Sequence, residues 1–240
     1  MENQTQDSLS SSNVRFVTPY LKVVLSVARK DLRAEMRGRE MVSAMFLFAV
    51  LAVVIFSFAL ELDREARETS VAGVLWVTII FAGMLGLSRS MAVEKDKGSL
   101  DALLIAPVSR SAIFYGKMLG NLLFTLIVAF MLMVLLTVLF NISLLDPVLM
   151  VVVILGSVGF TAAGTLLASI SVYARARESL LPIVLLPVLL PVVLSAVRAT
   201  NALLTDLGAE EWAPWLRLLA LVDVAFLVGT FFLFDYVVEE

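Results

Sequence analysis

The 240 residues are 60% hydrophobic and 16% charged, with a mean hydropathy of +0.98 and a formal net charge of −3. Soluble domains contain about 45–50% apolar and about 25% charged residues, so this apolar excess cannot be buried within the chain and predicts an integral membrane protein. The chain has no cysteine and no histidine, which excludes disulfides, thiolate metal sites and histidine-based catalysis.

Residues 1–14 are polar, rich in serine and slightly acidic. A secretory signal needs a basic flank followed directly by an apolar run, and this segment has neither. We expect a disordered polar tail here.

Residues 15–40 are expected to form an amphipathic helix on the cytoplasmic face. One interpretation is a basic anchor lying flat in the membrane interface, attracted by anionic lipid headgroups. The other is an elbow helix that packs against the bundle and directs the first span. The apolar face is formed by Val17, Leu21, Val24, Ala28, Leu32 and Met36, and the basic face by Lys22, Arg29, Arg33 and Arg37.

Six segments are long and apolar enough to cross a bilayer, which takes about 20 mostly apolar residues. Their apolar residues are continuous and not alternating, so helices are expected in place of barrel strands. We therefore predict an all-α membrane protein, with one bundle of about six transmembrane helices occupying residues 41–240. The predicted spans are 41–60, 71–87, 118–140, 148–172, 180–197 and 216–234.

Lysine and arginine residues are distributed unequally between the two sides of this arrangement. The side of the N-terminus holds fourteen of them and the other side holds four. Because cytoplasmic loops of membrane proteins carry the excess of basic residues, both termini and the long loop 88–117 are expected in the cytoplasm.

The loop 88–117 is the most informative stretch for mechanism. A cluster of alternating charge, residues 94–97, is followed by a glycine and then by a short apolar stripe with an acidic first turn. This pattern predicts a short amphipathic helix that either docks into a groove of a soluble partner or packs on its own bundle. The residues concerned are Glu94, Gly98, Leu100, Asp101, Leu103, Leu104 and the terminating Pro107.

Three prolines, Pro182, Pro187 and Pro191, lie in the fifth predicted span. Each removes a backbone hydrogen bond and bends or breaks a helix. The span is then either a kinked packing helix, or a hinge or re-entrant pair of half-helices that lets the bundle change shape.

Glycines Gly156, Gly159 and Gly164 in the fourth predicted span allow close approach between helices, as do Gly116 and Gly120. Packing is the expected role of all five.

Asp223 is the one acidic residue well inside a predicted span. An intramembrane carboxylate is costly and marks a functional candidate. We place it about two turns from the outer end of its helix, where it is a candidate for a partner contact.

The stretch from Glu94 to Lys117 resembles the signature of ABC-2 type permeases, and the closer similarity is to the CcmB family, the permease subunit of the so-called haem exporter of cytochrome c maturation. Three features carry this resemblance. They are Gly98-Ser99-Leu100-Asp101 with Pro107, the glycine-rich fourth span ending in the basic loop Arg175-Ala176-Arg177, and the proline-repeated fifth span from Leu180 to Pro191. The family usually has glutamate at the position of Asp101.

The resemblance implies a non-catalytic membrane subunit that acts in haem delivery for c-type cytochromes in the bacterial inner membrane. It implies no cofactor bound by this chain, ATP on a CcmA-like cytoplasmic ATPase, and haem presented by a CcmC-like protein. The chain itself lacks the Walker A pattern that cradles nucleotide phosphates. Further expected partners are a second copy of the chain and the lipid bilayer, and none is a nucleic acid. Arg175 and Arg177 join residues 94–107 as expected ATPase-coupling residues.

Two other functions remain open on the sequence. One is an ABC-2 permease that exports a lipid, a polysaccharide or a drug. The other is a stand-alone secondary transporter, which predicts inverted repeats and polar midplane residues that the chain does not clearly show. An intramembrane enzyme is disfavoured because Ser–His and zinc chemistries lack their residues.

Overall fold

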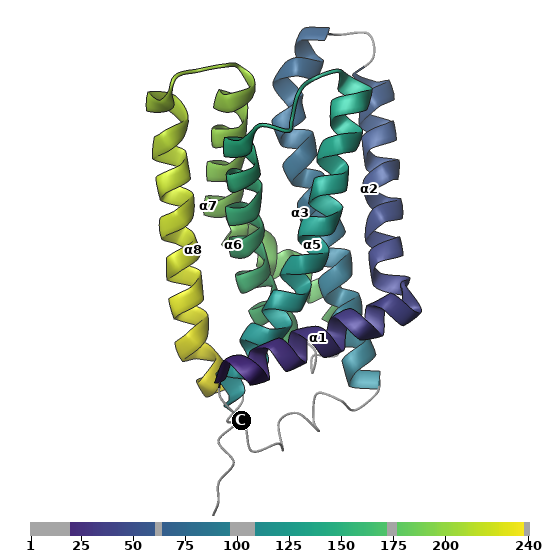
Figure 1. The fold of residues 1–240 in the computed structure, drawn as a ribbon, viewed down its shortest axis with the longest axis vertical. Coiled ribbons are helices and arrows are strands. Elements are labelled where there is room, and N and C mark those ends of the chain that lie inside the picture. The colour runs from purple at the N-terminus through teal and green to yellow at the C-terminus, as the bar shows by residue number, and fades with distance from the viewer. Residues whose placement is uncertain (1–19, 61–63, 97–108, 172–176, 238–240) are drawn as a thin grey trace, which may run out of the picture.

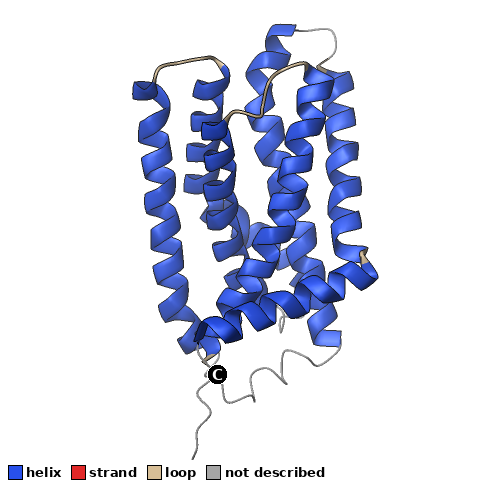
Figure 2. Ribbon diagram, viewed as in Figure 1, coloured by secondary structure: helices blue, strands red, loops and turns tan. Residues whose placement is uncertain are grey.

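The computed structural model describes residues 20–60, 64–96, 109–171 and 177–237. Within these ranges the chain is helical and contains no strand (Figure 2). The helices are α1 (Tyr20–Gly38), α2 (Glu40–Ala59), α3 (Arg64–Asp96), α5 (Arg110–Phe140), α6 (Pro147–Ser171), α7 (Arg177–Leu204) and α8 (Ala209–Val237).

Six of these helices are long and apolar enough to cross a membrane, which confirms the predicted bundle. They run side by side, with α1 lying across one end of the bundle at a steep angle to the others (Figure 1). The membrane-spanning parts are Glu40–Ala59, Thr69–Val93, Arg110–Phe140, Pro147–Ser171, Leu181–Leu204 and Ala209–Phe232.

The predicted loop 88–117 is wrong at both of its ends. Helix α3 continues to Asp96, and α5 begins at Arg110, so only residues 97–108 lie outside the described part of this stretch. Helices tolerate charged residues once they leave the hydrocarbon, and Lys117 has an acidic partner inside the protein. Hydropathy alone therefore ended the first of these helices too early and began the second too late.

Arg198, expected in an outer loop, and Arg217, expected at the outer end of the last span, lie inside α7 and α8. Both are exposed, and the Arg198 guanidinium sits 6.0 Å from the centroid of the Trp215 ring. A long cationic side chain near a helix end reaches the interface while its stem covers apolar surface.

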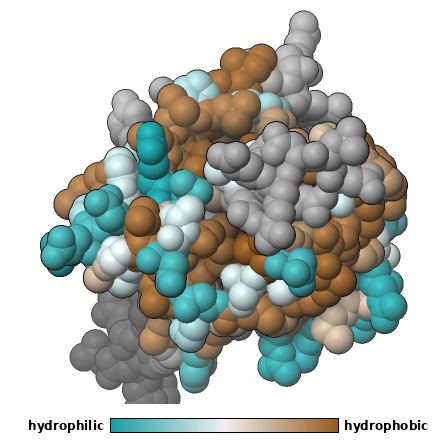
Figure 3. Space-filling view, turned by 90° about the horizontal axis from the view of Figure 1, so that it is seen from above, coloured by the Kyte–Doolittle hydropathy of each residue, from teal (hydrophilic) through white to brown (hydrophobic). Residues whose placement is uncertain are grey.

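The sides of the bundle expose apolar residues such as Leu47, Leu51 and Ile55 on α2 and Leu190 on α7. The end-on view in Figure 3 instead shows hydrophilic residues among hydrophobic ones. Apolar side walls and an end of mixed polarity match a protein surrounded by lipid.

Helix α6 lies at the centre of the bundle, in contact with α3, α5, α7 and α8. Hydrogen bonds between neighbouring helices supplement the apolar packing. Trp76 Nε1 on α3 donates to Thr200 Oγ1 on α7 at 3.0 Å, and Asn121 Nδ2 on α5 donates to Thr165 Oγ1 on α6 at 3.1 Å. In lipid such bonds contribute about 1 kcal/mol each and fix which helix faces meet.

A sharp corner joins α1 to α2. Arg39 adopts a left-handed conformation with φ of 53°, and its N–H donates to the carbonyl of Glu35 at 2.7 Å. Glu35 Oε1 accepts the N–H of Val42 at 2.8 Å, which satisfies one free donor at the start of α2. The corner lets α1 turn away from the direction of α2 and cross the end of the bundle.

Candidate coupling site at the α1 end of the bundle

Two of the predicted coupling residues, Glu94 and Arg177, lie within the described part of the chain. Glu94 lies in the last turn of α3, and Arg177 is the first residue of α7, although neither side chain is described. Helix α3 ends, α5 begins, α6 ends and α7 begins at the end where α1 lies (Figure 1). Gly98, Leu100, Asp101, Leu103, Leu104, Pro107 and Arg175 are outside the described residues, and their coupling role stays a prediction.

Helix α1 packs chiefly on α5, close to where α5 begins. Val24, Val27 and Ala28 of α1 are buried there. A Cβ atom added to Gly116 of α5 would lie 2.6 Å from Val27 Cβ and 2.9 Å from the carbonyl oxygen of Val24. Only glycine allows the two backbones to approach this closely, so α1 is seated on α5.

An ion pair crosses the same contact. Lys117 Nζ on α5 lies 3.6 Å from Asp31 Oδ2 on α1, and the Lys117 side chain is only 3% exposed. Asp31 also pairs with Lys30 of its own helix at 3.1 Å. A buried ammonium without an anion nearby is strongly unfavourable, so Asp31 ties α1 to α5.

The sequence-based interpretation missed this pair. It assigned Lys117 to the basic side of the loop and did not use Asp31. A signal was present, because an acid three residues after Ala28 and seven after Val24 lies on the apolar face of the helix. The buried face includes Val27 and Asp31 and leaves Leu21 and Met36 exposed, so it is rotated from the predicted apolar stripe.

The α6 glycines lie against side chains of three neighbouring helices. A Cβ added to Gly156 would collide with the Trp76 ring of α3. A Cβ added to Gly164 would collide with Leu87, which is also on α3. Gly159 faces Asp223 of α8 and Val192 of α7. These positions let bulky or polar neighbours come directly against the α6 backbone.

Asp223 lies midway along α8 and not two turns from its outer end, because α8 begins at Ala209. The residue is 3% exposed and packs on Gly159 of α6. Neither carboxyl oxygen has a hydrogen-bond partner within the described part of the chain. A contact between Asp223 and another protein would therefore require α6 and α8 to separate.

Replacing Asp223 with asparagine should leave the free energy of unfolding within about 1 kcal/mol of the original, or raise it, because no bond to this carboxyl is lost. Thermal unfolding of the purified protein measures this. Asp31→Asn is the matched control and should lower stability, since Asp31 is engaged with Lys117. A large loss in Asp223→Asn would reveal an interaction of the carboxyl that this packing lacks.

The three prolines lie within a single helix, α7. This continuity excludes the re-entrant pair of half-helices, and a hinge role stays a prediction. Pro187 and Pro191 are exposed, whereas Leu185, Leu189 and Val192 form the buried face. Pro187 and Pro191 therefore lie on the exposed side of α7, whereas Pro182 is half-buried and lines a cavity with Ala168 and Ser171 of α6.

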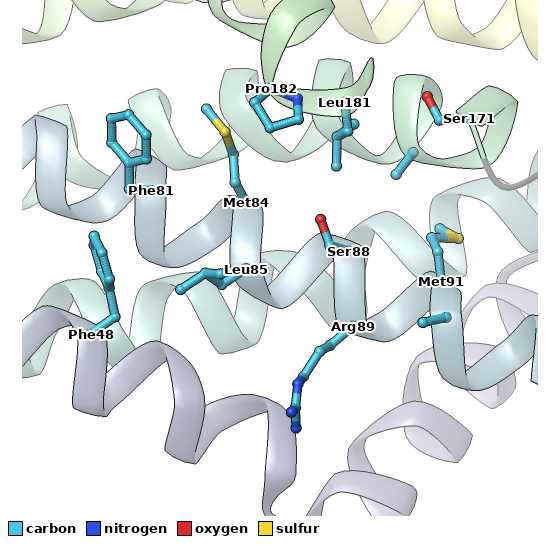
Figure 4. A pocket seen from close by; sticks show the side chains of 12 residues that line it. Phe48, Phe81, Met84, Leu85, Ser88, Arg89, Met91, Ser171, Leu181 and Pro182 are labelled. Atoms are coloured by element: carbon cyan, nitrogen blue, oxygen red, sulfur yellow. The ribbon is translucent and has the colours of Figure 1, made fainter. Parts of the chain in front are cut away.

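A cavity of about 380 Å³ opens between α2, α3, α6 and α7 near the α1 end. Figure 4 shows Phe48, Phe81 and Met84 on its apolar side and Ser88 with Arg89 at its polar side. Arg89 Nη1 lies 3.7 Å from Glu40 Oε2. The cavity suits an apolar group better than a strongly polar ligand.

Residues 22–238 match the sequence model of the family described as CcmB protein, and the match runs from α1 through all six spanning helices. The chain belongs to the CcmB family. Relatives of the same kind carry the name heme exporter protein B. That of Pseudomonas aeruginosa is 24% identical over 80% of this chain and 86% of its own length. That of Rhodobacter capsulatus is 28% identical over 68% and 75% of the two chains, and that of Bradyrhizobium diazoefficiens is 24% identical over 86% and 93%.

The residues that match the CcmB family include those that form the α1–α5 contact as well as the spanning helices. The match includes the stretch 97–108 and the basic loop at 173–176, for which the structure gives no geometry. The described end of the bundle is therefore a scaffold for the predicted coupling segment, which connects α3 to α5 in the sequence. Helix α1 is held on α5 by the close approach at Gly116 and by the Lys117–Asp31 pair.

Proposed function

We propose that this chain is the transmembrane permease subunit of an ABC-type complex that acts in haem delivery for c-type cytochrome maturation. The observation that carries the proposal is the CcmB family match along nearly the whole helical bundle. The relatives' name, heme exporter protein B, supports haem as the cargo. The described bundle supplies the six spanning helices that such a subunit needs.

ATP hydrolysis is assigned to a separate CcmA-like ATPase, since the sequence lacks the phosphate-binding pattern of Walker A. The ATPase would dock on residues 98–107 at the α1 end. These residues connect α3 directly to α5, so a force applied there acts on two spanning helices at once. Because α1 is seated on α5, it would move with the start of that helix.

The α1 end is proposed to face the cytoplasm of a bacterial cell, with the bundle in the inner membrane. Fourteen of the 18 lysine and arginine residues belong to this side of the chain. Basic residues are retained in the cytoplasm during insertion, which supports this orientation. It also places the docking segment where a cytoplasmic ATPase can reach it.

Haem is the proposed cargo of the complex and not a group held by this chain. The chain has no histidine or cysteine, two of the side chains that most often ligate haem iron. We therefore assign iron ligation to a CcmC-like partner. The role of this subunit is to respond to the ATPase within the membrane.

The first test is co-purification of the tagged full-length chain from native membranes, followed by identification of partners by mass. We expect an ATPase and a haem-handling membrane protein. The Leu103→Asp/Leu104→Asp variant should lose the ATPase and keep the membrane partner, because two charges replace the apolar stripe of the docking helix. Leu207→Asp, an exposed leucine at the other end of the bundle, is the control and should keep both.

A second readout tests the cargo. In cells lacking the endogenous gene, the chain should restore covalent haem attachment to c-type cytochromes, and the Leu103→Asp/Leu104→Asp variant should not. Recovery of an ATPase without restored cytochromes would point to export of another substrate. Absence of any ATPase after mild extraction would favour a stand-alone transporter.

A further inference from the structure

Helix α1 carries a strongly basic face that points away from the bundle. Lys22, Arg29, Lys30, Arg33 and Arg37 lie outside the buried contact with α5. With about 3.6 residues per turn, Arg29, Arg33 and Arg37 follow one another along one side of the helix. The opposite side, with Val24, Val27 and Ala28, is the one buried on α5.

The acidic residues of α1 offset little of the charge of its arginines. Asp31 pairs with Lys117 of α5 and with Lys30 at the edge of the basic face. Glu35 accepts the backbone N–H of Val42 at the corner with α2. The side of α1 that carries the arginines therefore presents a net positive charge to its surroundings.

An exposed apolar flank lies between the basic face and the buried face. Leu21, Leu25 and Met36 are 71%, 59% and 69% exposed. Such a flank is costly next to water alone, but it is favourable beside hydrocarbon.

The level of α1 along the bundle matches the edge of a bilayer. Helix α1 contacts α5 at Gly116 and near Gly120. From Gly120 to Phe140, the last residue of α5, the helix rises about 30 Å, which is the thickness of the hydrocarbon core. If the core covers that stretch of α5, then α1 lies at the depth of the headgroups.

We propose that α1 is a binding surface for anionic phospholipids of the leaflet at its end of the bundle. Arg29, Arg33 and Arg37 bind the headgroup phosphates, and Leu21, Leu25 and Met36 lie beside the start of the acyl chains. A lipid fits this surface better than an acidic protein does, because the adjoining apolar flank needs hydrocarbon. The proposal does not depend on the cargo or on the ATPase.

The absence of cysteine allows a site-specific test on the full-length chain. Leu25→Cys is labelled with a fluorophore and the protein is reconstituted into phosphatidylcholine vesicles. A small, fixed fraction of the lipid carries a quenching spin label near the carboxyl end of one acyl chain, on either phosphatidylglycerol or phosphatidylcholine. The ratio of quenching by the two labelled lipids measures the preference for an anionic headgroup at α1.

We expect labelled phosphatidylglycerol to quench more strongly. Arg29→Gln/Arg33→Gln should lower the preference roughly fivefold or more, since each basic side chain near an anionic surface strengthens association about fivefold. Glutamine keeps the helix, being a good helix former. Arg198→Gln/Arg217→Gln removes the same charge from α7 and α8 and should leave the preference unchanged.

Three results would overturn the proposal. A quenching ratio near one in the unsubstituted protein would show that α1 does not select anionic lipid. A label that neither lipid quenches would show that α1 lies outside the bilayer interface. If Arg29→Gln/Arg33→Gln then also lost the cytoplasmic ATPase on co-purification, the basic face would belong to a protein contact instead.

Discussion

Replacing Asp31 with alanine is expected to destabilise the protein by about 3 kcal/mol, because the buried Lys117 ammonium then loses the Asp31 carboxylate. The loss should be visible as a lower unfolding temperature of the purified chain. Loosening of α1 should accompany it, seen as faster proteolysis near the α1–α2 corner. Both effects follow from one contact, in which the pair holds α1 on α5.

A double substitution separates the ion pair from the packing around it. Asp31→Leu/Lys117→Met removes both charges and keeps apolar bulk, so it should recover most of the stability that Asp31→Ala loses. If the double variant were as unstable as the single one, the side chains would matter through their shape and not through their charges.

Replacing Gly156 with alanine is expected to cost roughly 2–4 kcal/mol. The added Cβ collides with the Trp76 ring, which is fully buried and donates to Thr200 on α7. Overpacking of this kind and loss of the hydrogen bond both contribute. Because α6 touches four other helices, the displacement should spread, and reduced assembly with the partner subunits is expected.

Gly229→Ala is the matched control for this prediction. Gly229 lies in α8, and a Cβ added there meets nothing within 4 Å. Alanine is a better helix former than glycine by about 1 kcal/mol, so this variant should be as stable as the original or slightly more stable. Equal losses in Gly156→Ala and Gly229→Ala would show that helix glycines are needed for flexibility and not for close packing. Trp76→Phe combined with Gly156→Ala should relieve part of the collision.

The sequence was sufficient for the number and type of the spanning elements. Continuous apolar runs in a chain this hydropathic can only be helices, since lipid offers no partner for an unpaired backbone. The resemblance in the loop at 94–117 and in the glycine and proline spans led to the CcmB family, which the family match confirms. The ends of the helices were harder to predict, because the arginine at 198 and the lysine at 117 have the charge typical of loop residues.

The packing of the helices was not available from the same patterns. Glycine spacing in α6 indicated close contacts without naming Trp76, Leu87 or Asp223 as the neighbours. The prolines of α7 were compatible with a broken or a continuous helix, and the structure has the continuous one.

Composition and local pattern by themselves determined that this is a six-span helical membrane protein, and they predicted a basic end and a preceding amphipathic helix. Those properties depend on how many apolar residues follow one another and on which side the charges lie, and both can be counted along the chain. Only the tertiary structure decided that α1 is seated on α5, that Lys117 is buried against Asp31, and that Asp223 packs on Gly159. Each of these depends on the rotation and depth of one helix relative to another, which a single helix does not encode.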